Sequence, residues 1–120
     1  MKILVVDDEQ MIRDLAVKIL TRDGHNVTTA ESGQDGVAAF ERAADEIDLV
    51  LIDATLSDLS GADAIRQMRS LAPGVPCILS SGHALEEITL PEDLSGQVHF
   101  LEKPYRARQL SALVNDILSI

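Results

Sequence analysis

The sequence is poor in cysteine, in basic residues and in long apolar runs, and each shortage excludes a class of protein. Its single cysteine, Cys77, excludes an internal disulfide framework and fits a reducing compartment. It has 10 Lys and Arg against 20 Asp and Glu, and a formal net charge of −10 argues against direct nucleic-acid binding, which needs a basic surface. No apolar run approaches the roughly 18–20 residues needed to cross a bilayer.

The N-terminus also lacks the apolar core of a secretory signal. Asp7 and Asp8 interrupt the first apolar run almost at once. We therefore expect an acidic, soluble, cytoplasmic protein that does not insert into membranes. A length of 120 residues suits one compact domain, and the chain contains no repeat, low-complexity tract or linker that would divide it. We expect residues 1–120 to form a single domain.

Short apolar runs alternate with segments of helical periodicity along the whole chain. At least three of the runs are continuously apolar, a pattern typical of strands that are buried on both faces of a parallel sheet. This alternation predicts a three-layer α/β fold with right-handed crossovers. The five expected strands cover residues 3–6, 27–30, 49–52, 77–79 and 98–101.

The expected helices carry recognisable termini. Ser32 and Ser60 each precede an apolar-periodic segment and can cap its free amides, with an acid three residues on. Gly24 can end the first helix, and the last helix begins near Arg106. The predicted inward positions are Ile12, Leu15, Ala16, Ile19 and Leu20, then Val37 and Phe40, then Ile65 and Met68, and finally Leu110, Leu113, Val114, Ile117 and Leu118.

The interval between the fourth and fifth strands fits this scheme less well. Pro91 disfavours one continuous helix because it lacks an amide donor and its ring clashes with the preceding turn. We expect a short helix near residues 84–89, followed by an irregular or one-turn segment, and we expect this interval to be mobile because short helices are marginal without packing.

Acidic side chains follow two of the predicted strands directly. Asp7 and Asp8 come after the first strand and Asp53 after the third, so a parallel sheet places them at one edge, where ligands of open α/β sheets bind. Two carboxylates about 4 Å apart repel by roughly 4 kcal/mol at an effective dielectric of about 20, which favours a bound cation such as Mg²⁺ or a retained proton. Ser81 and Lys103 follow the fourth and fifth strands and belong to the same edge.

A structural interpretation of these acids competes with the functional one. Any single acid could simply occupy a loop or favour the positive end of the first helix. The set as a whole, with each member at the same sheet edge, favours a site. For His25, His99 and Cys77 the structural interpretation is preferred, because the histidines lack companions at metal-ligand spacing and a thiol in a strand acts as a small apolar group.

These residues, taken in order, resemble the response-regulator receiver domain over essentially the whole chain. The resemblance rests on the stretch from Ile3 to Glu9, on Asp53, on Ser81 and on the pair Lys103-Pro104. It implies a flavodoxin-like, doubly wound, five-stranded parallel sheet of order 2-1-3-4-5 with helices on both faces. It also implies a phosphorylation-dependent signalling switch of a two-component or phosphorelay system rather than an enzyme acting on external substrates.

The resemblance further implies the roles of individual residues. Asp53 would accept the phosphoryl group from a phosphohistidine on a histidine kinase or histidine phosphotransfer protein. Asp7, Asp8, Asp53 and the backbone carbonyl of Thr55 would hold Mg²⁺ or Mn²⁺, and the Lys103-Pro104 peptide would be cis. The sequence identifies neither the cognate kinase nor the output partner.

Five positions take the following roles from the resemblance alone. Ser81 and Lys103 would contact the phosphoryl group, and Phe100 would change rotamer on activation. Thr55 and His83 occupy positions that modulate dephosphorylation. One departure concerns the turn after Asp53, where Leu56-Ser57 replaces the common Met-Pro, so we expect a looser turn.

Other functions remain open from the residues. A Mg²⁺-dependent phosphatase acting on external substrates would normally want a second acid two residues after the nucleophile, where Thr55 stands. A flavin or nucleotide binder would need a phosphate cradle after the first strand, where Asp7 and Asp8 would repel phosphate unless metal is present. A phosphorylation-independent interaction domain is the remaining alternative.

Overall fold

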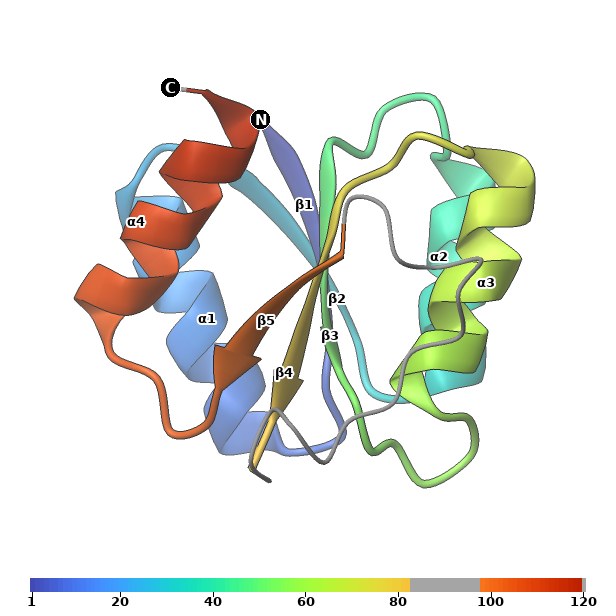
Figure 1. Cartoon of the computed structure of the whole chain (residues 1–120), viewed down its shortest axis with the longest axis horizontal. Helices are drawn as coiled ribbons and strands as arrows, with labels where there is room; N and C mark the ends of the chain where they lie inside the picture. The colour runs from blue at the N-terminus through green and yellow to red at the C-terminus, as the bar shows by residue number, and fades with distance from the viewer. Residues whose placement is uncertain (83–97, 120) are drawn as a thin grey trace.

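The computed structural model describes residues 1–82 and 98–119 of the chain. Within residues 1–82 strands and helices alternate, and residues 98–119 add a strand followed by a helix, as the sequence predicts (Figure 1). The strands are β1 (Lys2–Val6), β2 (Asn26–Ala30), β3 (Leu49–Asp53), β4 (Cys77–Ser81) and β5 (Val98–Glu102). The helices are α1 (Gln10–Arg22), α2 (Gly33–Arg42), α3 (Gly61–Leu71) and α4 (Ala107–Leu118). Each strand extends one or two residues beyond its apolar run.

The strands form one parallel sheet in the order β2-β1-β3-β4-β5. The expected fold class and strand order are therefore confirmed. The order reverses between β1 and β3, because the chain first adds β2 on one side of β1 and then β3 on the other. All strands end at the same edge of the sheet, which lies at the bottom of Figure 1.

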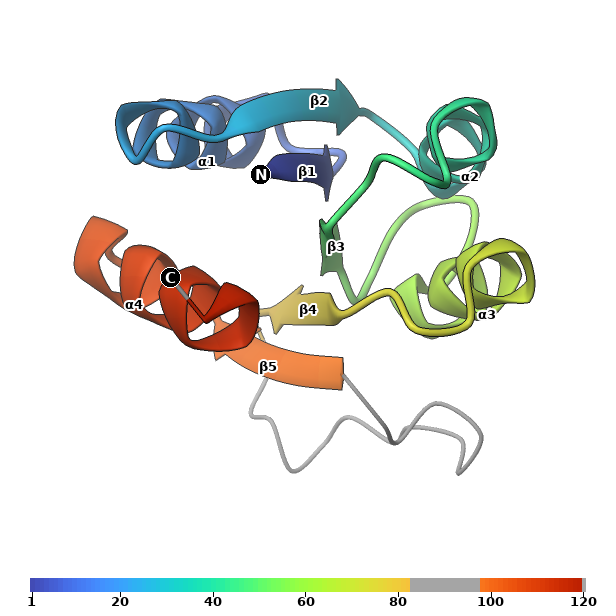
Figure 2. The same cartoon turned by 90° about the horizontal axis from the view of Figure 1, so that it is seen from above.

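Helices cover both faces of the sheet (Figures 1 and 2). Alternate residues of the central strands divide the core into two clusters, since successive side chains point to opposite faces. Leu4, Val6 and Ile52 pack with residues of α2 and α3, including the fully buried Phe40 and Met68. The other cluster joins α1 and α4 to the strands and contains Ile3, Val5, Leu49, Leu51, Ile78, Leu101, Leu110 and Val114.

The predicted helix termini are present. Ser32 Oγ accepts a hydrogen bond from the Asp35 amide, and Ser60 Oγ accepts one from the Asp63 amide, both at 3.1 Å. Gly24 follows α1 with φ of +93°, a conformation that side chains other than glycine rarely adopt. Arg106 precedes α4, and the Gln109 side chain accepts a hydrogen bond from the Arg106 amide at 2.7 Å.

One sequence-based expectation about an individual position is wrong, and one about a segment falls outside the described residues. Leu15 was expected on the buried stripe of α1, but it is 39 % exposed, and the stripe narrows to Ala16, Ile19 and Leu20 because α1 covers only one edge of the sheet. Tyr105 had no assigned place and is buried beside α4. The helix expected near residues 84–89 and its mobility lie outside the described residues.

The helices of residues 1–82 and 98–119 include none with both the length and the apolar character of a membrane span.

Candidate functional site

Strand pairing brings Asp7 and Asp53 together. Asp53 is the last residue of β3, and Asp7 directly follows β1, the neighbouring strand. Both acids continue the set of odd-numbered residues that faces α1 and α4, after Ile3 and Val5 on β1 and after Leu51 on β3. Their side chains therefore converge at the point where the strand order reverses, and both residues are buried, with 3 % and 5 % of their surfaces exposed.

Lys103 places its ammonium group between the two buried carboxylates. Its Nζ lies 2.8 Å from Asp7 Oδ2 and 3.2 Å from Asp53 Oδ2, and only 10 % of the lysine side chain is exposed. A third, weaker contact of 3.6 Å reaches Glu9 Oε1. The backbone of Lys103 is held as well, because its amide donates a hydrogen bond to the Ser81 carbonyl at 2.7 Å. The Lys103-Pro104 peptide is cis, as the resemblance implies.

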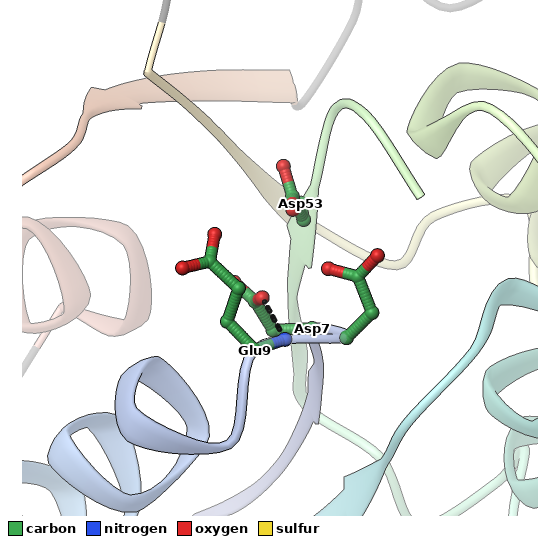
Figure 3. Close-up of side chains that lie close together, drawn as sticks. Asp7, Glu9 and Asp53 are labelled. Atoms are coloured by element: carbon green, nitrogen blue, oxygen red, sulfur yellow. Dashed lines mark hydrogen bonds between the residues drawn. The ribbon is translucent and has the colours of Figure 1, made fainter. Parts of the chain in front are cut away.

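Backbone amides fix the other oxygen of each buried carboxylate. The Glu9 amide donates to Asp7 Oδ1 at 2.9 Å, the contact drawn as a dashed line in Figure 3. The Thr55 amide donates to Asp53 Oδ1 at 3.1 Å. In both cases the donor lies two residues after the acid, so each carboxylate folds back on its own loop. One oxygen is thereby held by the backbone while the other faces Lys103.

Two further acids extend the cluster toward solvent. Asp8 and Glu9 are exposed, yet one carboxylate oxygen from each of Asp7, Asp8, Glu9 and Asp53 lies within 4.8 Å of the others. Figure 3 shows Asp7 and Glu9 on the segment after β1, close to Asp53 at the end of β3. An oxygen-only set of this kind is what Mg²⁺ binds in proteins, so the residues present fit that cation. Glu9, considered from sequence only as a helix-end acid, joins the cluster as well.

Burial and charge act against each other in setting the pKa values of this site. Burial raises the pKa of Asp53 above its ordinary value, and the Thr55 amide and Lys103 offset only part of that rise. Burial alone would lower the pKa of Lys103, but the hydrogen bond to Asp7 and the charge of Asp53 raise it overall. Burial, together with the charge of Asp7, raises the pKa of Tyr105 to about 12. Lys103 therefore stays charged beside acids that exceed it in number.

The cluster opens onto a cavity of about 400 Å³ at the carboxyl edge of the sheet. Its walls come from four segments of the chain that are distant in sequence but meet at this edge. They are Asp8, Glu9, Asp53, Thr55, Gly82 and Lys103. A solvent-borne group can therefore approach the buried Asp53 carboxylate from this side.

Arg13 supports the site, although no pattern in the sequence distinguishes it from the other arginines. Its guanidinium donates a hydrogen bond to the Asp7 carbonyl at 2.7 Å and lies 3.5 Å from Glu31 Oε1. Only 11 % of the Arg13 side chain is exposed. The arginine thus joins α1 to the segment after β2 and holds the backbone at Asp7. A lone arginine on a helix has no motif, so only the packing reveals this role.

Two further predicted residues, Ser81 and Phe100, lie on the neighbouring strands β4 and β5. Ser81 ends β4 and is buried, and its position continues the set of Cys77 and Leu79, which faces α2 and α3. Phe100 is half-buried, pairs with Leu79 across β4 and β5, and packs against the same core cluster. His83 lies outside the described residues.

Comparison with known proteins agrees with this geometry. The family model described as "Response regulator receiver domain" matches residues 3–115. Sensor kinase CckA of Brucella abortus is 28 % identical over 97 % of this chain, and response regulator SaeR of Staphylococcus aureus is 26 % identical over 98 % of it. The chain spans only 12 % of that CckA and half of SaeR.

Solved receiver domains have the same fold over nearly their whole length. A response regulator receiver domain protein from Clostridium thermocellum superimposes with a TM-score of 0.89 at 32 % identity, covering 98 % of this chain and 94 % of that one. The receiver domain of hybrid histidine kinase CckA gives a TM-score of 0.85 at 26 % identity, with 98 % and 99 % coverage. The chain therefore belongs to the response regulator receiver domains, the phosphoacceptor switches of two-component signalling.

Proposed function

We propose that residues 1–120 form a single cytoplasmic receiver domain in which Asp53 accepts a phosphoryl group from a phosphohistidine. The donor is a histidine kinase or a histidine phosphotransfer protein. The observation that carries this proposal is the setting of Asp53, a buried carboxylate that lines the cavity and has Lys103 Nζ 3.2 Å from its Oδ2.

The acid cluster supports a divalent cation beside Asp53. Asp7, Asp8, Asp53 and the backbone carbonyl of Thr55 would hold Mg²⁺ or Mn²⁺, with water completing the shell. When bound, this cation supplies neutralisation of the charge on the phosphoryl oxygens. The four clustered carboxylates exceed the single charge of Lys103, so the cluster has negative charge left for a cation to neutralise.

The chemistry assigned to Asp53 is nucleophilic. One carboxylate oxygen attacks the phosphorus, the P–N bond to the donor breaks, and the imidazole leaves with the electron pair of that bond. Lys103 reduces the repulsion between the carboxylate and the incoming anion. The phosphoryl group is later removed by hydrolysis, in which water attacks the phosphorus, the bond to the Asp53 oxygen breaks and inorganic phosphate leaves. Thr55, which lines the cavity, and His83 would modulate the rate of this separate reaction. The domain thus assists its own phosphorylation and dephosphorylation without acting on external substrates.

The proposed response to phosphorylation involves Ser81 and Phe100. A phosphoryl group adds nearly two negative charges and strong acceptor oxygens, which would draw in the Ser81 hydroxyl. By alternation along the strands, Ser81 and Phe100 share the α2/α3 face of β4 and β5. A shift of the Ser81 segment would therefore make room for Phe100 and alter the surface of this face.

Phosphorylation with a small donor tests this function. Acetyl phosphate and Mg²⁺ are expected to add one base-labile phosphoryl group, measured by intact-mass spectrometry, and Asp53→Asn is expected to abolish it. Asp45→Asn is the matched control, because Asp45 is an exposed acid in the turn after α2. Labelling that persists in Asp53→Asn, or that is lost equally in Asp45→Asn, would move the acceptor away from Asp53.

A further inference from the structure

Asp58 joins two segments that are far apart in sequence, the β3–α3 loop (residues 54–60) and the first turn of α2. Its Oδ1 accepts a hydrogen bond from the Gly33 amide, and its Oδ2 accepts one from the Gln34 amide, both at 2.9 Å. The amide of Leu59, within the loop itself, also donates to Oδ1 at 2.9 Å. One side chain therefore ties the loop after Asp53 to a neighbouring helix.

The α2 terminus is built to receive this carboxylate. The first amides of a helix have no partner within the helix. The Ser32 hydroxyl accepts a hydrogen bond from the Asp35 amide, and the Asp58 carboxylate accepts hydrogen bonds from the amides of the two residues between Ser32 and Asp35. The Gln34 and Gly33 hydrogen bonds lower the pKa of Asp58, so the carboxylate stays ionised next to the positive end of the helix.

Gly33 allows the close approach that these hydrogen bonds require. A Cβ at this position would lie 2.8 Å from Leu59 Cβ and 3.1 Å from Asp58 Oδ1. Leu59 in turn packs against the core cluster on the α2/α3 face. The contact between the loop and the helix is therefore close-packed as well as hydrogen-bonded.

The same loop carries the groups that contact Asp53. The Thr55 amide donates to Asp53 Oδ1 at 3.1 Å, and Thr55 lines the cavity. A bridge between Thr55 and Ser60 closes the base of the loop, while Asp58 anchors its tip.

We propose that Asp58 is a positioning residue for phosphorylation at Asp53, holding the β3–α3 loop against α2 so that the Thr55 amide and carbonyl keep their places beside the acceptor. This inference rests on the proposed function and deepens it. It makes the α2 terminus part of the support of the site. Removing the carboxylate would free the loop tip without touching any group that contacts the phosphoryl donor.

The test compares Asp58→Ala with Ser32→Ala. Both variants remove a cap from α2 and are expected to lower Tm by a few degrees, but only Asp58→Ala releases the loop. We expect Asp58→Ala to weaken Mg²⁺ binding, measured by calorimetry, and to slow labelling by acetyl phosphate, each about 10-fold, as for other residues that orient metal ligands. Ser32→Ala is expected to retain wild-type values for both. Asp58→Asn, which keeps one acceptor oxygen, is expected to lie between.

A second measurement does not depend on activity. Exchange of the Thr55 amide hydrogen in the metal-free protein, followed by NMR, is expected to be faster in Asp58→Ala and Asp58→Asn than in wild type, and unchanged in Ser32→Ala. If Asp58→Ala fails to fold, Asp58→Asn carries the comparison.

The outcomes separate the two proposals. Wild-type protein that is labelled at Asp53, together with Asp58 variants of unchanged Mg²⁺ affinity, labelling rate and Thr55 exchange, would reduce Asp58 to a helix cap and overturn the positioning role alone. Wild-type protein that takes up no phosphoryl group on Asp53 would overturn the proposed function and this inference with it.

Discussion

The two ends of the sheet bury ionisable side chains in opposite ways. At the carboxyl end, Lys103 Nζ lies 2.8 Å from Asp7 Oδ2 and 3.2 Å from Asp53 Oδ2, so the buried ionisable groups are paired. At the amino end, His25 precedes β2 with 6 % of its surface exposed, and neither ring nitrogen has a hydrogen-bond partner among the residues that the structure describes. One end keeps buried charges by pairing them, while the other keeps a neutral ring.

Burial is the largest influence on the pKa at both ends, and it favours the uncharged form in each case. It raises the pKa of Asp53 and lowers that of His25. The N-terminal ammonium lowers the pKa of His25 further, and Asp23 offsets part of this. The two ends differ in net charge. The acids at the carboxyl end carry more negative charge than Lys103 balances, and a bound cation can neutralise this excess, whereas a neutral histidine leaves no charge to neutralise. Only the first arrangement attracts a cation through unbalanced negative charge.

The largest effect on stability is expected from removing the positive charge of Lys103 at the carboxyl end of the sheet. Lys103→Ala leaves two buried carboxylates without their shared partner, and losing one member of a buried pair typically costs about 3–5 kcal/mol. We expect the free energy of unfolding, measured by urea titration at pH 7 without divalent ions, to fall by about 3 kcal/mol. Adding Asp53→Asn to this variant is expected to recover part of the loss.

Lys2→Ala is the matched control for this variant. Lys2 Nζ pairs with Glu46 Oε2 at 2.7 Å, but 34 % of the lysine side chain and 66 % of the glutamate side chain are exposed. Exposed pairs contribute about 0–1 kcal/mol, so this variant should change stability little. Equal losses of unfolding free energy in the two variants would show that Lys103 contributes no more to stability through its ion pairs than a surface lysine does.

The sequence predicts the fold well because the patterns that encode it are local. Apolar runs located all five strands to within two residues, and the serine caps Ser32 and Ser60 identified helix starts through contacts of three residues' span. The error at Leu15 has a geometric cause, since periodicity gives the direction of a side chain but not the width of the surface that the helix covers. The strand order came from the resemblance, because no local pattern specifies which strand lies next to β1.

The candidate site likewise contains some features that local sequence patterns predict and others that they do not. Residues that directly end strands, such as Asp53, could be placed at one sheet edge from sequence. Contacts between distant segments could not be predicted from sequence. The contact of Arg13 with Asp7 and that of Asp58 with α2 are examples, because the residue types and spacings involved are ordinary. Their importance comes from where the folded backbone presents a carbonyl or a free amide. The burial of Tyr105 was also out of reach, since a residue just after a strand can face either way.

A smaller, pH-dependent effect on stability is expected from His25 at the amino end of the sheet. The folded-state pKa of His25 lies below the ordinary value of 6.5, so below about pH 6.5 the unfolded chain binds a proton that the folded chain does not. Stability contributed by the neutral ring is therefore present above this range and is lost as pH falls. One such group changes stability by at most about 1.4 kcal/mol per pH unit.

His25→Leu isolates this contribution. Between pH 7.5 and 5.5 the wild type is expected to lose about 1 kcal/mol more stability than the variant, measured by urea titration at several pH values. At pH 7.5 the variant should be at least as stable as wild type, because it removes two buried nitrogens without partners. Parallel pH curves for the two proteins would mean that the imidazole is protonated equally in the folded and unfolded states.

The smallest expected effect is a gain in stability on substituting Asp53, and it follows from the raised pKa of that residue. Above that pKa the folded protein holds an ionised group that it disfavours, and the cost disappears as pH falls through the folded-state value. Asp53→Asn removes the charge permanently, so at pH 7 without divalent ions a gain of about 0.5 kcal/mol should raise Tm by about 2–4 °C. Asp58→Asn applies the same substitution to an acid whose pKa is lowered, and it should lower Tm. Opposite signs for the two changes in Tm, read by calorimetry, would show that the ionised carboxylate of Asp53 lowers stability while that of Asp58 raises it. A loss of Tm in both variants would mean that Lys103 already compensates the charge of Asp53, leaving less need for a cation at this edge.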